Sequence, residues 1–314
     1  MLKIVKAFAP ASIGNLSVGF DILGLSIDCI GDEVEVTLSN KPGVRLNKIH
    51  GNSNSLSLDP EKNCVTVPII EYLSYLNLLD KIGIEVELYK NLPLKSGMGS
   101  SASSSVAGVF ATNYLLGNKL SRIDLLNFIL KGEELASGAK HADNVAPSLL
   151  GGITLIRNNE PIDIIKINYP ENLVCVLAHP DLYVDTYTAR KILPEKIYLK
   201  DFVKQSANLS GFIIGMMTND FNLISRSFSD IIVEPVRKNL LPFFDDLKKA
   251  ILETDALGMG ISGSGPSVFA LAQSQKDAEK IKSSMIKVFE RFNLKNEIYI
   301  SKISKEGAKI ITEE

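Results

Sequence analysis

A run of very small residues lies between a strand pattern and a helix pattern, and it restricts the fold more than any other part of the chain. Residues 93–105 read PLKSGMGSSASSS. Before this run, residues 82–89 alternate between apolar and other side chains, as in a half-buried strand. After it, residues 106–116 form an apolar segment, which predicts a helix that ends at Gly117. The sequence therefore predicts a strand, a glycine-rich turn and a helix in immediate succession.

This turn has the composition of an anion-binding loop. Glycine has no Cβ, so its backbone N–H groups can approach a ligand closely, and the helix N-terminus adds the positive end of a dipole. A flexible Ser/Gly linker is the alternative, but linkers do not join a strand to an apolar helix within so few residues. The loop therefore predicts a phosphate site and, with it, a nucleotide.

Two other phosphate motifs fit less well. Gly97, Gly99 and Ala102 match G-x-G-x-x-A, but a dinucleotide fingerprint also needs a strand that ends in an acidic residue about twenty positions later. Residues 117–124 are instead typical of a turn that leads into a helix. No Gly-Lys-Ser or Gly-Lys-Thr occurs in the chain, which excludes a Walker A loop.

A second glycine-rich run occurs near the C-terminal end. Residues 258–266 read GMGISGSGP and precede a strand pattern at residues 267–272. We expect a second loop of exposed backbone donors here, so that both halves of the chain form the walls of one anion site. An ordinary tight connection is the alternative.

Composition and charge exclude several classes of function. The formal net charge of −2, with no dense basic run, argues against a nucleic-acid partner. No window approaches eighteen uncharged apolar residues, and the N-terminal segment does not resemble a signal peptide. Cys29, Cys64 and Cys175 lie far apart, which fits reduced thiols, and only three histidines are present, which disfavours a zinc site. We therefore expect a cytoplasmic protein without membrane or nucleic-acid partners.

Strand and helix patterns are mixed along the chain without strict alternation, which favours an α+β fold over a doubly wound sheet. The polar stretch at residues 157–161 is the best candidate for a boundary. We therefore predict an N-terminal domain at residues 1–158, which holds the glycine/serine loop, and a C-terminal domain at residues 159–314.

Three blocks together resemble the three motifs of the GHMP small-molecule kinases, in order and at plausible spacing. The blocks are residues 10–24 (PASIGNLSVGFDILG), 93–103 (PLKSGMGSSAS) and 260–266 (GISGSGP). Four further segments narrow the resemblance to the homoserine kinase branch of this family. They are residues 132–134 (GEE), 141–147 (HADNVAP), 186–194 (TYTARKILP) and 234–242 (EPVRKNLLP).

This resemblance covers nearly the whole chain and implies both fold and chemistry. It implies an N-terminal half like domain 2 of ribosomal protein S5, a ferredoxin-like C-terminal half, and a homodimer. It also implies transfer of the γ-phosphoryl group of ATP, with Mg²⁺, to the side-chain hydroxyl of L-homoserine, a step of threonine biosynthesis. Two departures are visible. Ser103 stands where the family loop has a second alanine, and Ile13-Gly14 stands where Ser-Ala is common. We expect both to affect packing more than chemistry.

The resemblance assigns residues to the nucleotide and its metal. Ser100 and Glu133 match the hydroxyl and carboxylate that hold Mg²⁺. Asn63 is expected to help frame the adenine. The full set predicted to bind ATP is Asn63, Pro93, Leu94, Lys95, Ser96, Gly97, Met98, Gly99, Ser100, Ser101, Ala102 and Ser103.

The resemblance also assigns the amino-acid pocket. Homoserine carries an ammonium, which Asp21 matches, and a carboxylate, which suits the planar forks of Arg190 and Arg237. The full set predicted to bind substrate is Asn15, Asp21, His141, Thr186, Arg190, Arg237 and Gly263.

The predicted catalytic residues are Asp143 and Asn144, together with the metal-binding Glu133. We expect Asp143 or Asn144 to hold the acceptor hydroxyl. No lysine can be placed as the partner of an aspartate base, so we expect catalysis without a strong general base, which a loose transition state allows. Two alternatives stay open: a GHMP kinase that acts on a mevalonate-type acid or a sugar, and a non-catalytic sensor of amino acids or nucleotides.

Overall fold

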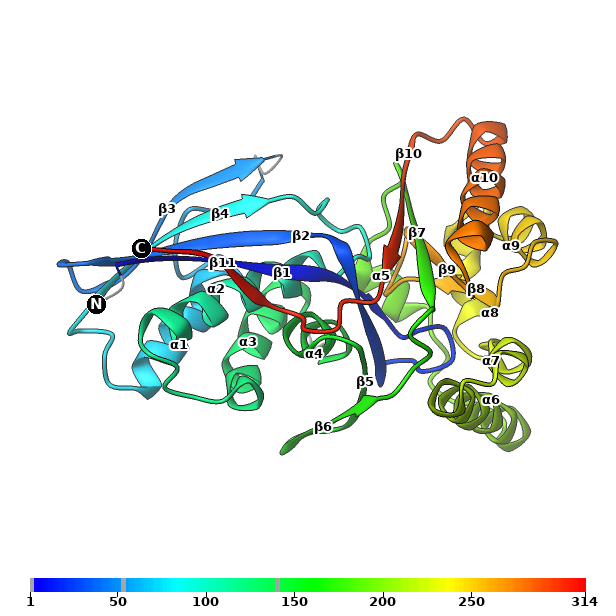
Figure 1. Ribbon diagram of the computed structural model, residues 1–314, viewed down its shortest axis with the longest axis horizontal. Helices are drawn as coiled ribbons and strands as arrows, with labels where there is room; N and C mark the ends of the chain where they lie inside the picture. The colour runs from blue at the N-terminus through cyan, green and yellow to red at the C-terminus, as the bar shows by residue number, and fades with distance from the viewer. Residues whose placement is uncertain (1–2, 52–54, 139, 141) are drawn as a thin grey trace.

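The computed structural model describes residues 3–51, 55–138, 140 and 142–314. Within these ranges the chain forms two β-sheets, each with helices against it (Figure 1). This is the α+β architecture that the sequence predicts. In the same ranges, no helix combines the length and apolar character needed to cross a bilayer.

The first sheet has seven strands in the order β11-β1-β2-β4-β3, with β5 paired to both β2 and β6. Most pairs are antiparallel, but β3 and β4 run parallel. The strands are β1 (Ile4–Gly14), β2 (Leu23–Ser39), β3 (Gly43–Gly51), β4 (Gly83–Lys90), β5 (Ile153–Asn159), β6 (Ile162–Ile167) and β11 (Lys309–Glu313). The last strand returns to pair with the first, so both ends of the chain lie at the same end of the molecule (Figure 1).

Four helices cover one face of this sheet (Figure 1). They are α1 (Thr66–Tyr75), α2 (Ser100–Leu115), α3 (Arg122–Ser137) and α4 (Ala142–Leu150). Ser121 caps α3, because its side chain accepts the N–H of Asp124.

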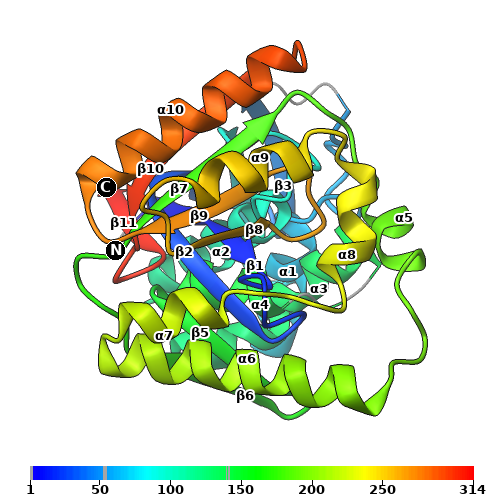
Figure 2. The ribbon, with the colours of Figure 1, turned by 90° about the vertical axis from the view of Figure 1, so that its right-hand side faces the viewer.

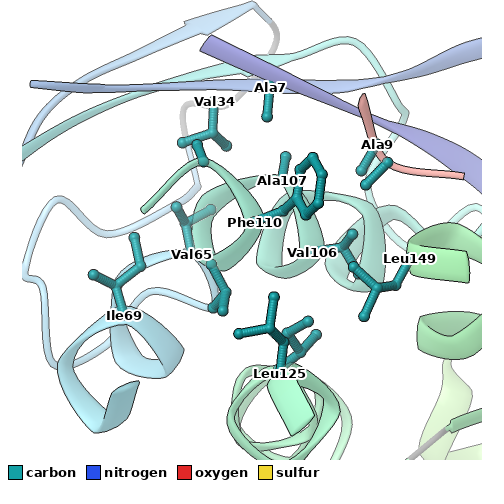
Figure 3. Packing of buried hydrophobic residues seen from close by; sticks show 14 of the residues in the cluster. Ala7, Ala9, Val34, Val65, Ile69, Val106, Ala107, Phe110, Leu125 and Leu149 are labelled. Carbon is teal, nitrogen blue, oxygen red and sulfur yellow. The ribbon is translucent and has the colours of Figure 1, made fainter. Parts of the chain in front are cut away.

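Helix α2 lies at the centre of the first core (Figure 3). Val106, Ala107 and Phe110 pack between the sheet on one side and helices α1 and α3 on the other. A helix surrounded in this way needs small side chains, and its buried hydroxyls need acceptors. Ser103 Oγ donates to Ala9 O at 2.7 Å, and Ser105 Oγ donates to Cys64 O at 2.6 Å. The serine-rich composition therefore serves burial as well as the loop.

The second sheet has the order β10-β7-β9-β8 and is antiparallel throughout. Its strands are β7 (Val174–Pro180), β8 (Gly258–Ile261), β9 (Val268–Ala272) and β10 (Asn296–Lys302). The helices of this half are α5 (Thr186–Lys191), α6 (Leu199–Thr218), α7 (Phe221–Ser227), α8 (Glu234–Arg237), the 3₁₀ turn η1 (Lys238–Leu240), α9 (Phe244–Leu252) and α10 (Gln275–Arg291).

The two faces of this second sheet pack differently. Helices α9 and α10 lie against one face, while α6 and α7 form the lower edge of this half (Figure 2). The other face contributes Leu177 and Phe269 to a core that also contains Ile13 and Leu25 from the first sheet. The two halves therefore share a continuous apolar interface.

Helix α2 begins at Ser100, so the serines of the loop and the apolar segment at residues 106–116 belong to one helix. The expected loop at 258–266 is wrong in its first part, because residues 258–261 pair with β9 as strand β8. The polar stretch at 157–161 lies within the first sheet, because residues 157–159 end strand β5 and residues 160–161 connect it to β6. The domain boundary at 158/159 stays a prediction.

Candidate active site

Two glycines shape the turn between β4 and α2. Gly97 has φ +78° and Gly99, the N-cap of α2, has φ +65°, both in the left-handed region. A Cβ on Gly97 would lie 2.5 Å from the carbonyl oxygen of Ser262, and a Cβ on Gly99 would lie 2.0 Å from Ser12 Oγ. These positions require glycine both for backbone conformation and for the close approach of neighbouring segments.

The three glycine-containing segments meet at this turn. Ser262 Oγ donates to Gly97 O at 2.6 Å, and Gly263 N–H donates to Gly14 O at 3.2 Å. Asn15 Nδ2 donates to Gly263 O at 3.0 Å. The prediction that both halves of the chain form the walls of one site is consistent with these contacts.

A cavity of about 450 Å³ opens where these segments meet. Its lining changes in character from one side to the other. Leu56 and Leu135 contribute apolar surface from the side of α1 and α3, whereas Asp21, Arg190 and Arg237 contribute charge from the side of α5 and α8. The N-terminus of α2 lies between, and its N-cap has no side-chain hydrogen bond. This arrangement suits a ligand with an apolar end, an anionic middle and a charged acceptor beyond.

Asp143 and Asn144 lie at the start of α4, beside the end of β1. Asp143 is 2 % exposed, and its burial, with the nearby charges of Asp21 and Glu133, raises its pKa to about 7. Asn15 N–H donates to Asp143 Oδ2 at 3.1 Å, while Oδ1 has no hydrogen-bond partner among the described residues. This carboxyl group is therefore buried in the cavity wall, with a hydrogen bond to only one of its two oxygens among the described residues.

The neighbouring amide is held as well. Ser12 Oγ donates to Asn144 Oδ1 at 3.0 Å. Gly14 makes the approach of β1 possible, because a Cβ there would lie 2.5 Å from Asp143 Oδ2 and 2.8 Å from Asn144 Nδ2. The glycine that departs from the family motif thus fits closely against the two predicted catalytic side chains.

Arginine and aspartate side chains gather at the charged side of the cavity. The guanidinium of Arg190 donates to both carboxylate oxygens of Asp21, at 3.2 and 2.5 Å. Arg237 is buried, and its Nε and Nη1 donate to the carbonyl oxygens of Ala189 and Gly263 at 3.2 and 2.8 Å. Its burial lowers its pKa, although the nearby charge of Asp21 opposes this shift. A buried guanidinium bonded only to neutral oxygens is well suited to bind an anion.

Glu133 lies on α3 and faces the first turn of α2. It is 5 % exposed, and Ser101 Oγ donates to its Oε2 at 2.7 Å. Ser100, which the resemblance assigns to the same metal ion as Glu133, has its Oγ 3.4 Å from Leu92 O. Among the described residues, no cluster of three or more His, Cys, Asp or Glu could hold a metal by itself. A carboxylate with serine hydroxyls is nevertheless a hard-oxygen set, and it suits a Mg²⁺ that keeps waters and phosphate ligands.

Comparisons with known proteins agree with this geometry. The model of the GHMP kinases N-terminal domain matches residues 66–152, and that of the GHMP kinases C-terminal domain matches residues 212–291. A homoserine kinase from Chlorobium phaeobacteroides is 43% identical over 99% of this chain and 100% of its own. The chain belongs to the GHMP kinase family.

Solved structures extend the comparison. A crystal structure of homoserine kinase from Cytophaga hutchinsonii has a TM-score of 0.96 and 49% identity, covering 99% of this chain and 98% of that one. The mevalonate kinase of L. major, solved with R-mevalonate, has a TM-score of 0.72 at 14% identity, covering 95% of this chain and 96% of that one, and so shares the fold alone. This GHMP kinase therefore groups with the proteins named homoserine kinase.

The structure brings most of the predicted residues of this GHMP kinase to the cavity. Those that line it are Asn15, Asp21, Asn63, Leu94, Lys95, Ser96, Gly97, Gly99, Ser100, Ser101, Glu133, Asp143, Asn144, Thr186, Arg190, Arg237 and Gly263. Met98, Ala102 and Ser103 are fully buried, and with the half-buried Pro93 they are not part of the lining. His141 lies outside the described residues.

Two predicted residues have local partners of their own. Asn63 uses its amide within its own loop, since its Oδ1 accepts Val65 N–H at 3.0 Å and its Nδ2 donates to Ser57 O at 2.8 Å. Thr186 Oγ1 lies 3.3 Å from Ser264 Oγ of the second glycine-rich run. Asn63 can therefore fix the position of the loop around the cavity mouth, while Thr186 links α5 to that run.

Sequence reasoning missed a buried ion pair beneath the loop of this GHMP kinase. Lys90, the last residue of β4, donates from Nζ to the carboxylate of Asp32, to Ser100 O and to Ser104 Oγ, the last two at 2.7 Å. Asp32 Oδ1 also accepts the N–H of Leu92 at 2.9 Å. This network ties both ends of the glycine turn to the sheet. The available signal was a charge at a position of each strand that the alternation predicts to be buried.

Proposed function

We propose that this GHMP kinase is an ATP-dependent homoserine kinase. It transfers the γ-phosphoryl group of ATP to the side-chain hydroxyl of L-homoserine and forms O-phospho-L-homoserine, a step of threonine biosynthesis in the cytoplasm. The single observation that carries this proposal for the acceptor is Arg237. It is a buried guanidinium at the cavity wall, held by two backbone carbonyls, with the carboxylate of Asp21 near enough to act on it electrostatically.

An amino-acid acceptor accounts for the charged side of the cavity. The carboxylate of homoserine binds at Arg237 and Arg190, and its ammonium binds at Asp21. Arg190 uses two of its N–H groups on Asp21 and keeps others for a substrate oxygen. A sugar has no charge for these groups, and a mevalonate-type acid has no ammonium for Asp21. The charge pattern therefore favours a zwitterion.

ATP fits the remaining part of the cavity. The adenine lies against the apolar surface that includes Leu56 and Leu135, close to the loop that Asn63 fixes. The phosphates meet the first N–H groups of α2, which have no intrahelical acceptor and lie at the positive end of the helix dipole. Glu133 with the hydroxyls of Ser100 and Ser101 would hold Mg²⁺, whose chemistry is to neutralise charge on the phosphate oxygens.

The reaction needs positioning more than covalent chemistry. The bond between the γ-phosphorus and the oxygen of ADP breaks, a bond to the homoserine oxygen forms, and the hydroxyl proton is released. Asp143 and Asn144 orient that hydroxyl, and the glycine turn fixes the phosphates. Because the transition state for phosphoryl transfer is loose, alignment and electrostatic stabilisation supply most of the rate.

The test is an assay of ADP release by the purified protein with ATP and Mg²⁺. The acceptors to compare are L-homoserine, L-serine, L-threonine, R-mevalonate and galactose. Release that depends on L-homoserine, with O-phosphohomoserine detected by phosphorus NMR, is the expected result. ADP release that depends on another acceptor would indicate a GHMP kinase with a different substrate. Tight ATP and homoserine binding without turnover would instead indicate a sensor.

A further inference from the structure

Helix α6 is the outermost helix at the lower edge of the C-terminal half (Figure 2), and two of its sides are occupied. One side carries Phe212 and Met216, both 1 % exposed, into the shared core. The next side faces α7, because a Cβ on Gly215 would lie 2.9 Å from Ile224, and one on Gly211 would lie 2.4 Å from Ser227 Oγ. These contacts account for the burial of α6 against its own molecule.

A third side of α6 is apolar and faces solvent. Five large side chains are more than half exposed along it: Leu199 (76 %), Phe202 (53 %), Val203 (59 %), Ile214 (52 %) and Met217 (56 %). Apart from Phe202 at its edge, they recur at spacings of three and four residues or their sums, as a single stripe on a helix does. We call these five residues with Ser206 and Ser210 the outer stripe of α6.

The outer stripe is symmetric about its middle. Large side chains lie at both ends, with Leu199 and Val203 towards the N-terminus and Ile214 and Met217 towards the C-terminus. Serines occupy positions 206 and 210 between them. Each large residue and its counterpart lie at nearly equal distances from residue 208. Two copies of α6 that cross antiparallel at this point would place large side chains against large ones, and the small serines would let the backbones approach.

Charge favours the same antiparallel arrangement. The N-terminal part of α6 and its approach carry Lys196, Lys200 and Lys204 against Glu195 and Asp201, a net charge of +1 (three minus two), and the C-terminal end is followed by Asp220. In an antiparallel pair, the lysines of one copy lie beside Asp220 and the negative end of the helix dipole of the other copy. A parallel pair would bring lysines against lysines.

The area is also of the right order for a dimer. Five exposed apolar side chains leave on the order of 500 Å² of apolar surface on one helix, close to the largest patch that a typical monomer exposes. The helix is about 30 Å long and 10–12 Å wide, so one side of it supplies the larger part of the about 800 Å² that each partner contributes to a standard interface.

We propose that the outer stripe of α6 is the contact between two copies of this chain, related by a two-fold axis near residue 208. Such an interface is isologous, because each copy presents the same surface to the other. It lies outside the cavity and does not depend on the proposed function.

The first test is the molecular mass of the purified protein, measured by light scattering and sedimentation at micromolar concentration. The expected result is a dimer for the natural sequence and a monomer for Val203→Glu/Ile214→Glu, with dimerisation at least about 100-fold weaker. Leu252→Glu is the matched control, because Leu252 at the end of α9 is also 56 % exposed and should leave the dimer intact. A natural sequence that stays monomeric, or a dimer unchanged by the stripe variant, would overturn the proposal.

The second test fixes the direction of the helices. The exposed Cys29 is first replaced by serine, and Leu199→Cys and Met217→Cys are then introduced singly and together. Residues 199 and 217 are about 27 Å apart along one helix, so no disulfide can join them within a copy. Cross-linked dimer from the double variant, but from neither single one, is the expected result. Cross-linking of the single variants would indicate a parallel pair, and no cross-linking at all would exclude this interface.

Discussion

Arg190 and Asp21 form a two-point ion pair that connects the two halves of the chain at the charged side of the cavity. Arg190 lies on α5 and Asp21 lies in the loop between β1 and β2, and their paired atoms are 3.2 and 2.5 Å apart. Asn15 positions the loop, because its Oδ1 accepts Asp21 N–H at 2.9 Å. The two groups predicted to bind opposite ends of a zwitterion are thus already adjacent.

Neutralising either member of this pair should weaken substrate binding. We expect Asp21→Asn and Arg190→Gln each to raise the KM for homoserine about 10- to 100-fold, the cost of losing a charged hydrogen bond. The KM for ATP should change much less. Steady-state kinetics with each substrate varied in turn measures both. Lys191→Gln is the control on the exposed side of α5, and a homoserine KM as low in Arg190→Gln as in that control would remove Arg190 from the pocket.

Gly97 should tolerate a methyl group far less than Gly117. Both have positive φ, so alanine is strained at either site. At Gly97 the new Cβ would also overlap Ser262 O at 2.5 Å, whereas at Gly117 nothing lies within 4 Å. We expect Gly117→Ala to cost about 1 kcal/mol of stability with normal kinetics. Gly97→Ala should in addition raise the KM for ATP at least about tenfold, because the loop must shift. Thermal unfolding and kinetics of the two variants decide the point.

The ion pair between Lys90 and Asp32 should act on the nucleotide site through the loop. The Lys90 side chain is 2 % exposed and that of Asp32 is fully buried, so Lys90→Met leaves a buried carboxylate and should destabilise the fold by about 3–5 kcal/mol. Adding Asp32→Asn should recover part of this loss. Lys305→Met, which breaks an exposed pair with Glu171, should cost about 1 kcal/mol or less.

Kinetics distinguish a positioning role of Lys90 from a purely structural one. If Lys90 positions the loop through Ser100 O and Ser104 Oγ, the Lys90→Met/Asp32→Asn variant should keep a raised KM for ATP after its stability has recovered, while its KM for homoserine stays near normal. Equal changes in both constants would show that Lys90 only supports the fold.

Glu133 and Glu134 offer a neighbouring comparison for the metal assignment. Glu133 is buried and accepts from Ser101, whereas Glu134 points outward and pairs with Lys131 at 3.7 Å. We expect Glu133→Gln to lower kcat at least about 100-fold and to raise the Mg²⁺ concentration needed for half-maximal rate. Glu134→Gln should change neither. Similar Mg²⁺ titration curves for the two variants would contradict the assignment.

Local patterns in the sequence predict the elements that repeat a single period. The strand before the glycine turn follows from alternation, helix α10 from helical spacing, and strand β9 from a short, continuous apolar run. Strand β8 does not, because its sequence GMGI has the composition of a turn and becomes a strand only by pairing with β9. The return of β11 to β1 depends on contacts between residues some three hundred positions apart, and no local pattern records them.

In the candidate site, too, local sequence patterns predict some features, whereas others depend on contacts between distant residues. The glycine turn is visible in the sequence because its backbone conformation demands glycine. The pairing of Ser101 rather than Ser100 with Glu133 depends on the rotational phase of α2, which is fixed only when the helix packs. For Lys90 and Asp32, alternation indicates two buried charges but not their pairing, because a strand pattern gives the face of a residue and not the partner that neutralises it.

A substitution at Asp143 can distinguish catalysis by positioning from catalysis by a general base. Its pKa of about 7 would allow it to accept a proton at neutral pH, but its Oδ2 is held by Asn15 N–H. A true base supplies about 10²- to 10⁴-fold in rate. Because a loose transition state needs little deprotonation, we expect Asp143→Asn to lower kcat less than about tenfold and to leave no step in kcat near pH 7. A larger loss with homoserine binding intact would make Asp143 the base.

The same variant should reveal the cost of burying this carboxyl group. The folded pKa is about 7, above the ordinary value of 3.8, so between these pH values the unfolded chain binds fewer protons than the native one at this site. The contribution of Asp143 to stability is therefore most favourable below pH 4, falls as the pH rises to 7 and is constant above it. Asparagine does not titrate. The free energy of unfolding of Asp143→Asn, relative to that of the natural protein, should therefore rise by up to ~4 kcal/mol between pH 4 and pH 7. Urea unfolding of both proteins at pH 5, 6, 7 and 8 measures the difference. A difference that does not change with pH would mean that Asp143 has an ordinary pKa in the folded protein, and the burial that raises this pKa would then be wrong.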